Sequence, residues 1–299
     1  MQSKHVLDRL SEKSGSLCPG RASAGFRRFM GLWRPIIKLI LRPRVQGWEH
    51  LPDEPYLLVA NHSGGGVAEL VALAERWLAC QPHRVLATMA HPVAFHVPGA
   101  AAFVRHGGAI PSTRRHALEV LAAGTPVMVF PGGDHEAFRP LWQYQEVDFA
   151  GRRGFLRLAR TAWVPIVPLG ISGSHITVPI LWRSKILPWL GVLPRLAGLK
   201  RIPVSLPLIL SVVLTWIAAS SVMGSAAAAA LAWVWLAFPV SALVPMVPTS
   251  IRFRFGAPIE PEGLFGTQQP QAGEADELML AAARDRVQAA VQALVVEDR

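Results

Sequence analysis

The stretch Tyr56-Leu57-Leu58-Val59-Ala60-Asn61-His62-Ser63-Gly64-Gly65 places an apolar run directly before polar residues and glycines. A short apolar run bounded by turn residues is typical of a strand that is buried on both faces. Strands of that kind occur in parallel sheets covered by helices. Because ligands bind beyond the carboxyl ends of such strands, we expect Asn61 and His62 to face a substrate.

Further apolar runs alternate with helix-like segments on both sides of this stretch. Strands are expected at residues 84–89, 126–130 and 164–169, and helices at 68–79, 113–123 and 152–162. The alternation predicts an α/β fold with a mainly parallel central sheet covered by helices on both faces. Residues 250–255 alternate like a strand, and we expect this strand to return to the same sheet.

Residues 202–251 form a run without any charged residue. One membrane crossing needs about 20 apolar residues, so an apolar helical hairpin that crosses twice fits this run. Ser220, Ser221, Gly224 and Ser225 lie near its middle, where such a hairpin would turn. Because both flanks are basic, both ends are expected on the cytoplasmic side of the membrane. A shallow insertion and a buried core hairpin are the alternatives.

Charge is scarce in this chain and unevenly placed. Hydrophobic residues make up 51% of the 299 residues and charged residues 17%, while the net charge is +10. Much of the positive charge lies in residues 1–44, where residues 26–41 mix aromatic, aliphatic and basic side chains. This pattern indicates a basic amphipathic segment at a membrane surface, or alternatively a helix packed on the body of the protein. No nucleic-acid motif accompanies the charge, so we expect no nucleic-acid partner.

Cysteine and histidine spacing gives little sign of a metal site. Cys18 and Cys80 have no paired spacing, so neither a disulfide framework nor a thiolate metal site is indicated. The histidines show no ligand spacing on one helix face, and we expect no metal. A reducing, cytoplasmic-facing location follows from the same cysteine usage.

His62 is the candidate general base. An unperturbed imidazole titrates near ~6.5 and can accept a proton at neutral pH. Glu69 follows seven residues later, at the start of an expected helix that would fold it back to orient the ring. The glycines after His62 allow a substrate to come close. A structural role, the commoner one for a lone histidine, is the alternative.

The second constellation is Phe130-Pro131-Gly132-Gly133-Asp134-His135-Glu136-Ala137-Phe138-Arg139. A glycine pair after a strand can present backbone N–H groups to an oxyanion or a phosphate, or can simply form a tight turn. Glu136 and Arg139 are placed to hold a polar acceptor. In the segment between the two constellations, Arg105 and either Arg114 or Arg115 are cations able to face phosphates.

Four blocks in order carry a family resemblance. They are residues 60–65, 108–111, 129–137 and 164–168. Together they resemble the four blocks of the glycerolipid (phospholipid/glycerol) acyltransferase superfamily. The Pro-Gly-Gly form of the third block resembles the branch with monoacylglycerol and diacylglycerol acyltransferases. The resemblance covers roughly residues 45–261, apart from the apolar insertion.

The resemblance implies an O-acyltransferase without a metal or redox cofactor. His62 would deprotonate an acceptor hydroxyl, which attacks the thioester of acyl-CoA or an acyl carrier protein. The acceptor would be a lipid-like alcohol such as a lysophospholipid or a mono- or diacylglycerol, so membrane lipids are expected partners. Catalytic roles fall on His62 and Glu69, and substrate-binding roles on Asn61, Ser63, Gly64, Arg105, Arg114, Gly132, Gly133, Glu136 and Arg139.

Two positions depart from the family pattern. Glu69 stands where the family usually has Asp, and Gly132 stands where many relatives have Glu. The first departure affects how strongly the carboxylate at position 69 would interact with His62. The second argues that the acceptor need not be a phosphorylated glycerol.

This interpretation divides the chain into three parts. Residues 1–44 form the membrane-surface segment, 45–261 the acyltransferase domain with its apolar insertion 202–251, and 262–299 a linker and C-terminal helix. Two other classes of protein are alternatives. A serine hydrolase would use Gly170-Ile171-Ser172-Gly173-Ser174, which lacks the final glycine of a nucleophile elbow. A non-catalytic lipid-binding membrane protein is the other alternative. The sequence leaves the acceptor, the acyl length, the donor carrier and the oligomeric state open.

Overall fold

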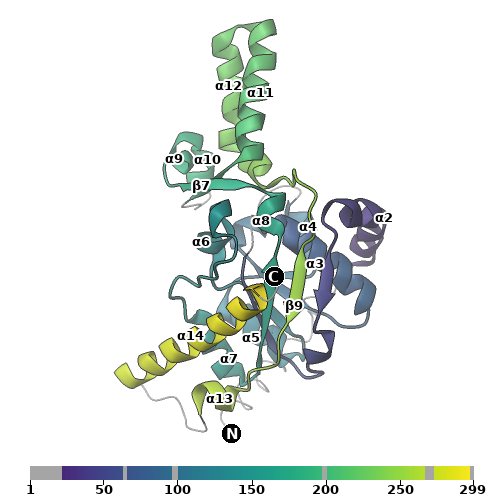
Figure 1. Cartoon of the computed structure of the whole chain (residues 1–299), viewed down its shortest axis with the longest axis vertical. Coiled ribbons are helices and arrows are strands. Elements are labelled where there is room, and N and C mark those ends of the chain that lie inside the picture. The colour runs from purple at the N-terminus through teal and green to yellow at the C-terminus, as the bar shows by residue number, and fades with distance from the viewer. Residues whose placement is uncertain (1–21, 63–65, 96–99, 197–200, 267–272, 297–299) are drawn as a thin grey trace.

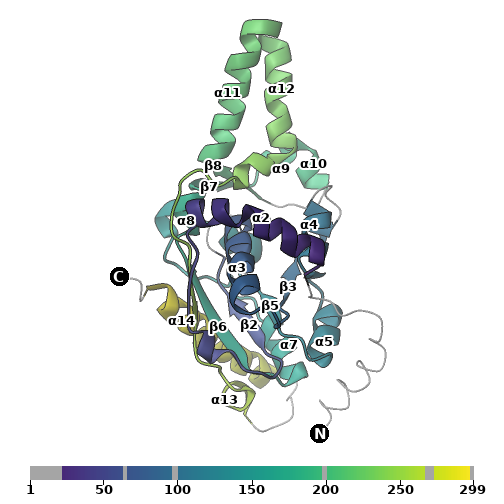
Figure 2. The ribbon, with the colours of Figure 1, turned by 90° about the vertical axis from the view of Figure 1, so that its right-hand side faces the viewer.

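A seven-stranded sheet forms the centre of the molecule (Figures 1 and 2). The computed structural model describes residues 22–62, 66–95, 100–196, 201–266 and 273–296. The strand order is β1-β9-β6-β2-β5-β3-β4, and all neighbours are parallel except β9, which runs antiparallel to β6. The strands are β1 Arg44–Gln46, β2 Leu57–Ala60, β3 Ala87–Ala90, β4 Ala109–Pro111, β5 Val127–Val129, β6 Ile166–Ser172 and β9 Arg252–Phe255. The expected mainly parallel sheet is confirmed, and the strand after residue 250 rejoins it.

Helices cover both faces of the sheet, as the buried strand β2 requires. Its four residues are fully buried and alternate between two apolar cores. Leu57 and Val59 face one core, and Leu58 and Ala60 face the other. The first core is closed by α5 Arg114–Ala122, α7 Gly154–Ala162, α13 Pro261–Phe265 and α14 Glu274–Val296. The second is closed by α2 Ala24–Ile40 and α3 Val67–Cys80, with α4 Ala100–His106 beside them.

The uncharged run forms a helical hairpin that projects away from the sheet (Figures 1 and 2). Its helices are α11 Leu206–Met223 and α12 Ser225–Ala237, and Gly224 lies between them with φ of 81°. The turn therefore lies where the serine and glycine residues predict it. Only 17% of the residues of α11 are buried, so the alternative of a hairpin buried in the core is wrong.

The base of the hairpin is a second, two-stranded sheet. β7 Ile180–Ser184 pairs antiparallel with β8 Ile202–Ser205, so the first residues of the uncharged run form a strand, not a helix. The short helices α9 Leu187–Gly191 and α10 Leu193–Leu196 lie between these strands in the chain. The Ser205 hydroxyl donates to the Ala242 carbonyl at 2.8 Å, which holds the two ends of the hairpin together.

Helix α2 has features of both interpretations of the basic N-terminal segment, the packed helix and the membrane-surface segment. Phe26, Met30 and Ile37 are buried in the second core, so the helix packs on the body of the protein. Leu32 and Leu39 on its other side are 77% and 67% exposed. The helix thus keeps an apolar outer face despite being packed.

Candidate active site

The imidazole of His62 lies at the carboxyl end of β2 and contacts the first turn of α3. Its Nδ1 atom is 2.5 Å from Oε1 of Glu69. Glu69 is fully buried and lies in the first turn of α3. A carboxylate only accepts hydrogen bonds, so Nδ1 carries the proton and Nε2 remains able to accept one. The ring is 15% exposed.

Phe130 and Gly66 both lie close to this ring. The Phe130 ring stacks on the imidazole, with centroids 3.9 Å apart and planes inclined by 10°. Gly66 has φ of 76°, and a β-carbon there would stand 3.5 Å from His62 Cε1. The imidazole is therefore restricted to one orientation by packing as well as by Glu69.

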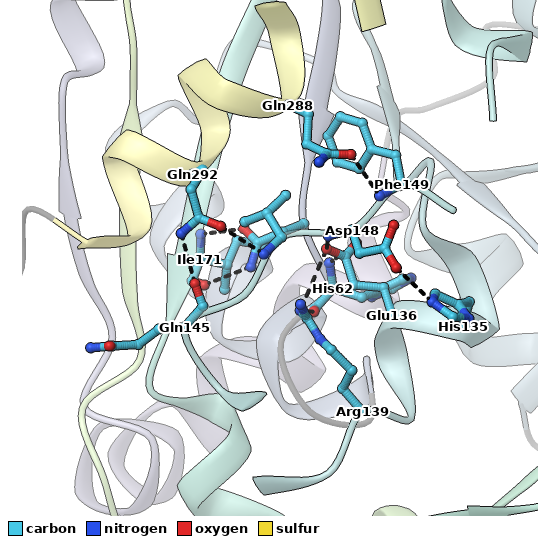
Figure 3. A network of polar contacts seen from close by, with 12 residues as sticks. His62, His135, Glu136, Arg139, Gln145, Asp148, Phe149, Ile171, Gln288 and Gln292 are labelled. Atoms are coloured by element: carbon cyan, nitrogen blue, oxygen red, sulfur yellow. Dashed lines mark hydrogen bonds and ion pairs between the residues drawn. The ribbon is translucent and has the colours of Figure 1, made fainter. Parts of the chain in front are cut away.

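The backbone of His62 is held at both its N–H and its carbonyl (Figure 3). Its N–H donates to Glu136 Oε2 at 3.0 Å. Its carbonyl accepts from Arg139 Nη2 at 3.2 Å, and this guanidinium also contacts Glu136 Oε1 at 3.4 Å. Both side chains are buried and come from α6 Gly133–Ala137 and the residues after it. The third block thus positions the candidate base of the first block.

Burial decides the protonation of Glu136. It raises the pKa of this carboxyl to about 7, while Arg139 and the N–H groups of His62 and Asp148 pull it down. Burial also lowers the pKa of the Arg139 guanidinium, and Glu136 opposes that change. The pair is a buried structural unit, and neither group is placed to exchange protons with a substrate.

The C-terminal helix supports this unit from a distance (Figure 3). Asp148 N–H donates to Glu136 Oε1 at 3.1 Å. The segment around Asp148 is held by two glutamines of α14: Gln288 accepts from Phe149 N–H at 3.0 Å, and Gln292 accepts from Val147 N–H at 2.9 Å. The sequence predicts only a C-terminal helix here, because these contacts join residues more than a hundred positions apart and leave no local signal.

Several residues expected to bind substrate have structural contacts instead. The Asn61 side chain is fully buried, with both amide groups bonded to the Ile171 backbone at 2.9 and 2.7 Å, so it ties the end of β2 to β6. The Gly133 N–H donates to the Phe130 carbonyl at 3.1 Å, so it is not available to an oxyanion. Gly132 lies directly against the Glu136 side chain.

Two expected phosphate contacts lie apart from this group. Arg105 donates to the Phe95 carbonyl at 3.2 Å, and Arg114 donates to Thr161 Oγ1 at 2.6 Å. Neither forms a hydrogen bond or ion pair with His62, Glu69 or the Glu136–Arg139 pair, as far as the described residues show. Ser63 and Gly64 lie outside the described residues.

Sequence reasoning missed two groups next to the site. Ser174 is fully buried, and its Oγ is 3.4 Å from the second carboxylate oxygen of Glu69. His135 connects Asp148 to Arg183 of β7 and to Arg201, the residue before β8. Only the tertiary structure brings these segments together. Over the described parts of the chain, no group of three or more His, Cys, Asp or Glu side chains is arranged to hold a metal ion.

Part of the chain is similar in sequence to known proteins. The family model described as Acyltransferase matches residues 42–172. An uncharacterized protein of Mycobacterium tuberculosis is 30% identical over 181 residues, which is 58% of this chain and 48% of that protein. The "DGAT1/2-independent enzyme synthesizing storage lipids" of Bos taurus is 26% identical over 147 residues, 49% of this chain and 43% of that protein. The chain thus spans about half the length of these curated relatives or less.

Two further similarities are more distant. The Arabidopsis thaliana "Phytyl ester synthase 1, chloroplastic" is 29% identical over 137 residues, 44% of this chain and 19% of that protein. The crystal structure of the 1-acyl-sn-glycerophosphate acyltransferase PlsC from Thermotoga maritima aligns with a TM-score of 0.48 and 17% identity, over 92% of this chain and 80% of that one. The family match confirms the resemblance carried by the sequence blocks. Residues 42–172, which carry His62, Glu69 and Glu136, are therefore similar to the Acyltransferase family.

Proposed function

We propose that the protein is a membrane-associated O-acyltransferase that moves a fatty acyl group from acyl-CoA or acyl carrier protein to a lipid-like alcohol. One observation carries the proposal: the 2.5 Å contact of His62 Nδ1 with Glu69 Oε1, in a family whose members transfer acyl groups. The contact leaves Nε2 of a partly exposed, oriented imidazole as a proton acceptor. The acceptor class is a lysophospholipid or a mono- or diacylglycerol.

The proposed reaction has two steps and balances without a cofactor. His62 Nε2 takes the proton of the acceptor hydroxyl as its oxygen attacks the thioester carbonyl, and the imidazolium is stabilised by Glu69. The tetrahedral intermediate then collapses, an ester forms, and the carbon–sulfur bond breaks. The thiolate leaves readily because a thiol is more acidic than an alcohol, and it accepts the proton from His62.

The hairpin supports the proposed membrane association. A bilayer core is about 30 Å thick, whereas a helix of 13 residues such as α12 spans about 20 Å. We therefore favour the shallow insertion over the two-pass hairpin, with the catalytic domain on the cytoplasmic side. The exposed apolar face of α2 is a second membrane contact in this proposal.

The relatives support a lipid alcohol as acceptor without identifying it. One is named for storage-lipid synthesis and another for phytyl ester synthesis. The serine-hydrolase alternative has less support, because Ser172, the serine of the elbow-like stretch, pairs with Arg252 as the last residue of β6 and the final glycine of the motif is missing.

Acyl transfer by the purified protein tests the proposal. With acyl-CoA or acyl carrier protein and a panel of lipid alcohols, His62→Ala should lower turnover by about a hundredfold or more. His116→Ala is the matched control, because this exposed histidine forms hydrogen bonds with Thr113, the N-cap of α5, and with no other residue that the structure describes. Near-normal transfer by folded His62→Ala protein would overturn the general-base role. Absence of transfer by the unmodified chain, with lipid binding intact, would favour the non-catalytic alternative.

A further inference from the structure

Two arginines at the base of the hairpin converge on one histidine of the third block. Arg183 lies on β7 and pairs with Pro203 of β8, and Arg201 lies two residues before Pro203. The two side chains are thus diagonal neighbours across the small sheet. Arg183 Nη1 is 3.0 Å from His135 Nδ1, and Arg201 Nη1 is 3.1 Å from the same atom. Helix α6, which carries His135, lies next to β7 in Figure 1.

The hydrogen bonds fix the state of His135. An arginine only donates, so Nδ1 of His135 accepts from both guanidinium groups. The ring proton is then on Nε2, which donates to Asp148 Oδ2 at 2.8 Å. Arg183 also donates to the His135 carbonyl at 2.6 Å. A neutral histidine therefore holds two like charges side by side and balances neither.

The nearby carboxylates form hydrogen bonds or ion pairs with other residues. Asp148 binds His135 and the Ala150 N–H. Asp134 pairs with Arg152 at 3.1 Å. Among the described residues, neither Arg183 nor Arg201 forms an ion pair with a carboxylate. Burial and the Arg201 cation lower the pKa of Arg183, and the charges of Asp148 and Asp134 oppose this change without reversing it.

The position of Arg183 and Arg201 limits the kinds of anion that could bind to them. Helix α11 begins five residues after Arg201, and the exposed apolar residues Ile186, Trp189 and Leu190 follow Arg183. If the hairpin enters the bilayer, the pair lies at the depth of lipid headgroups. One residue along α6 from His135, Glu136 holds the backbone of His62. The pair therefore lies between the lipid surface and the candidate base.

We propose that Arg183 and Arg201, held by His135, form a binding site for a phosphate ester. Planar guanidinium groups match the oxygens of a phosphate, and the anion would offset the repulsion between them. The phosphate would come from a phospholipid headgroup or from the carrier of the acyl thioester. The second source rests on the proposed acyl transfer, whereas the first does not.

Binding measurements without any acyl donor test this site. Inorganic phosphate should raise the thermal unfolding midpoint of the detergent-solubilised protein. Arg183→Gln and Arg201→Gln should each weaken phosphate binding about tenfold or more. Arg195→Gln is the control, because this exposed arginine of α10 lies over the Trp189 ring at the same end of the molecule. Arg183→Lys, which keeps the charge without the planar fork, should bind at an intermediate strength.

Two further arms identify the source of the phosphate. Loss of preference for phosphatidylcholine vesicles containing phosphatidylglycerol, in the glutamine variants alone, would assign the site to a lipid headgroup. Loss of protection by free coenzyme A would assign it to the thioester carrier. His62→Ala protein should bind phosphate normally, which separates this test from that of acyl transfer. Equal phosphate binding by the unmodified, Arg183→Gln, Arg201→Gln and Arg195→Gln proteins would overturn the proposal.

Discussion

The side chain of Glu136 occupies the space beside Gly132 that a β-carbon would need. A β-carbon at position 132 would overlap the carboxylate and the β-carbon of Glu136. This packing allows the Glu136 carboxylate to reach the N–H of His62, 3.0 Å away. The glycine is thus required by the side chain one turn later.

Gly132→Ala should displace Glu136 and release the backbone of His62. We expect a loss of about 1–3 kcal/mol of folding free energy, the usual range for overpacking, together with a lower kcat. Gly154→Ala is the matched control, because a β-carbon at this position in the first turn of α7 meets no atom within 4 Å. Thermal unfolding and steady-state kinetics check both variants. Unchanged stability and kcat in Gly132→Ala would contradict this role of Glu136.

Glu69→Gln should damage catalysis far more than thioester binding. The amide would present its N–H₂ group or its oxygen to His62 Nδ1, and the negative charge that stabilises the imidazolium would be lost. We expect kcat to fall about a hundredfold or more, with KM little changed. Glu69→Asp keeps the charge and should retain much more activity. If Glu69→Gln has full activity, the group that orients His62 lies elsewhere.

Glu136 should make stability fall as pH rises. Its pKa is about 7 in the folded protein against an ordinary value of 4.5, so folding favours the protonated form. The contribution is fully present below pH ~4.5 and is lost as pH rises through about 7, a change of about 3 kcal/mol. Glu136→Gln removes this titration. Urea unfolding at acidic and alkaline pH should show the smaller decline in the variant, and parallel pH profiles would refute the assignment.

The hairpin tip should stay within the membrane. Val222 is 83% exposed near the end of α11, and Lys185 is exposed near the hairpin base. In a background lacking Cys18 and Cys80, neither Val222→Cys nor Lys185→Cys should react with an impermeant thiol reagent in intact cells. After the membrane is opened, Lys185→Cys should react, whereas Val222→Cys should need detergent. Labelling of Val222→Cys in intact cells would show that the hairpin crosses.

The sequence was most informative where a local pattern reports burial. The run from Tyr56 to Ala60 is apolar at every position because β2 is covered on both faces, and the structure confirms it. The uncharged run with its central Gly224 likewise predicted the hairpin and its turn. Residues 202–205 were the exception, because Ile-Pro-Val-Ser is apolar both as strand β8 and as the start of a hairpin.

By itself, the sequence determined the family blocks, the mainly parallel α/β sheet and the pairing of His62 with Glu69, which are close in the chain. These features depend on residue type and short spacing, which local physics constrains. Only the tertiary structure decided that Asn61 ties two strands and that Glu136 and Arg139 hold the His62 backbone. It alone brought Arg183 and Arg201 together at His135. Such contacts join residues about 50 to 110 positions apart, and which side chains meet there depends on how the sheet and its insertion pack.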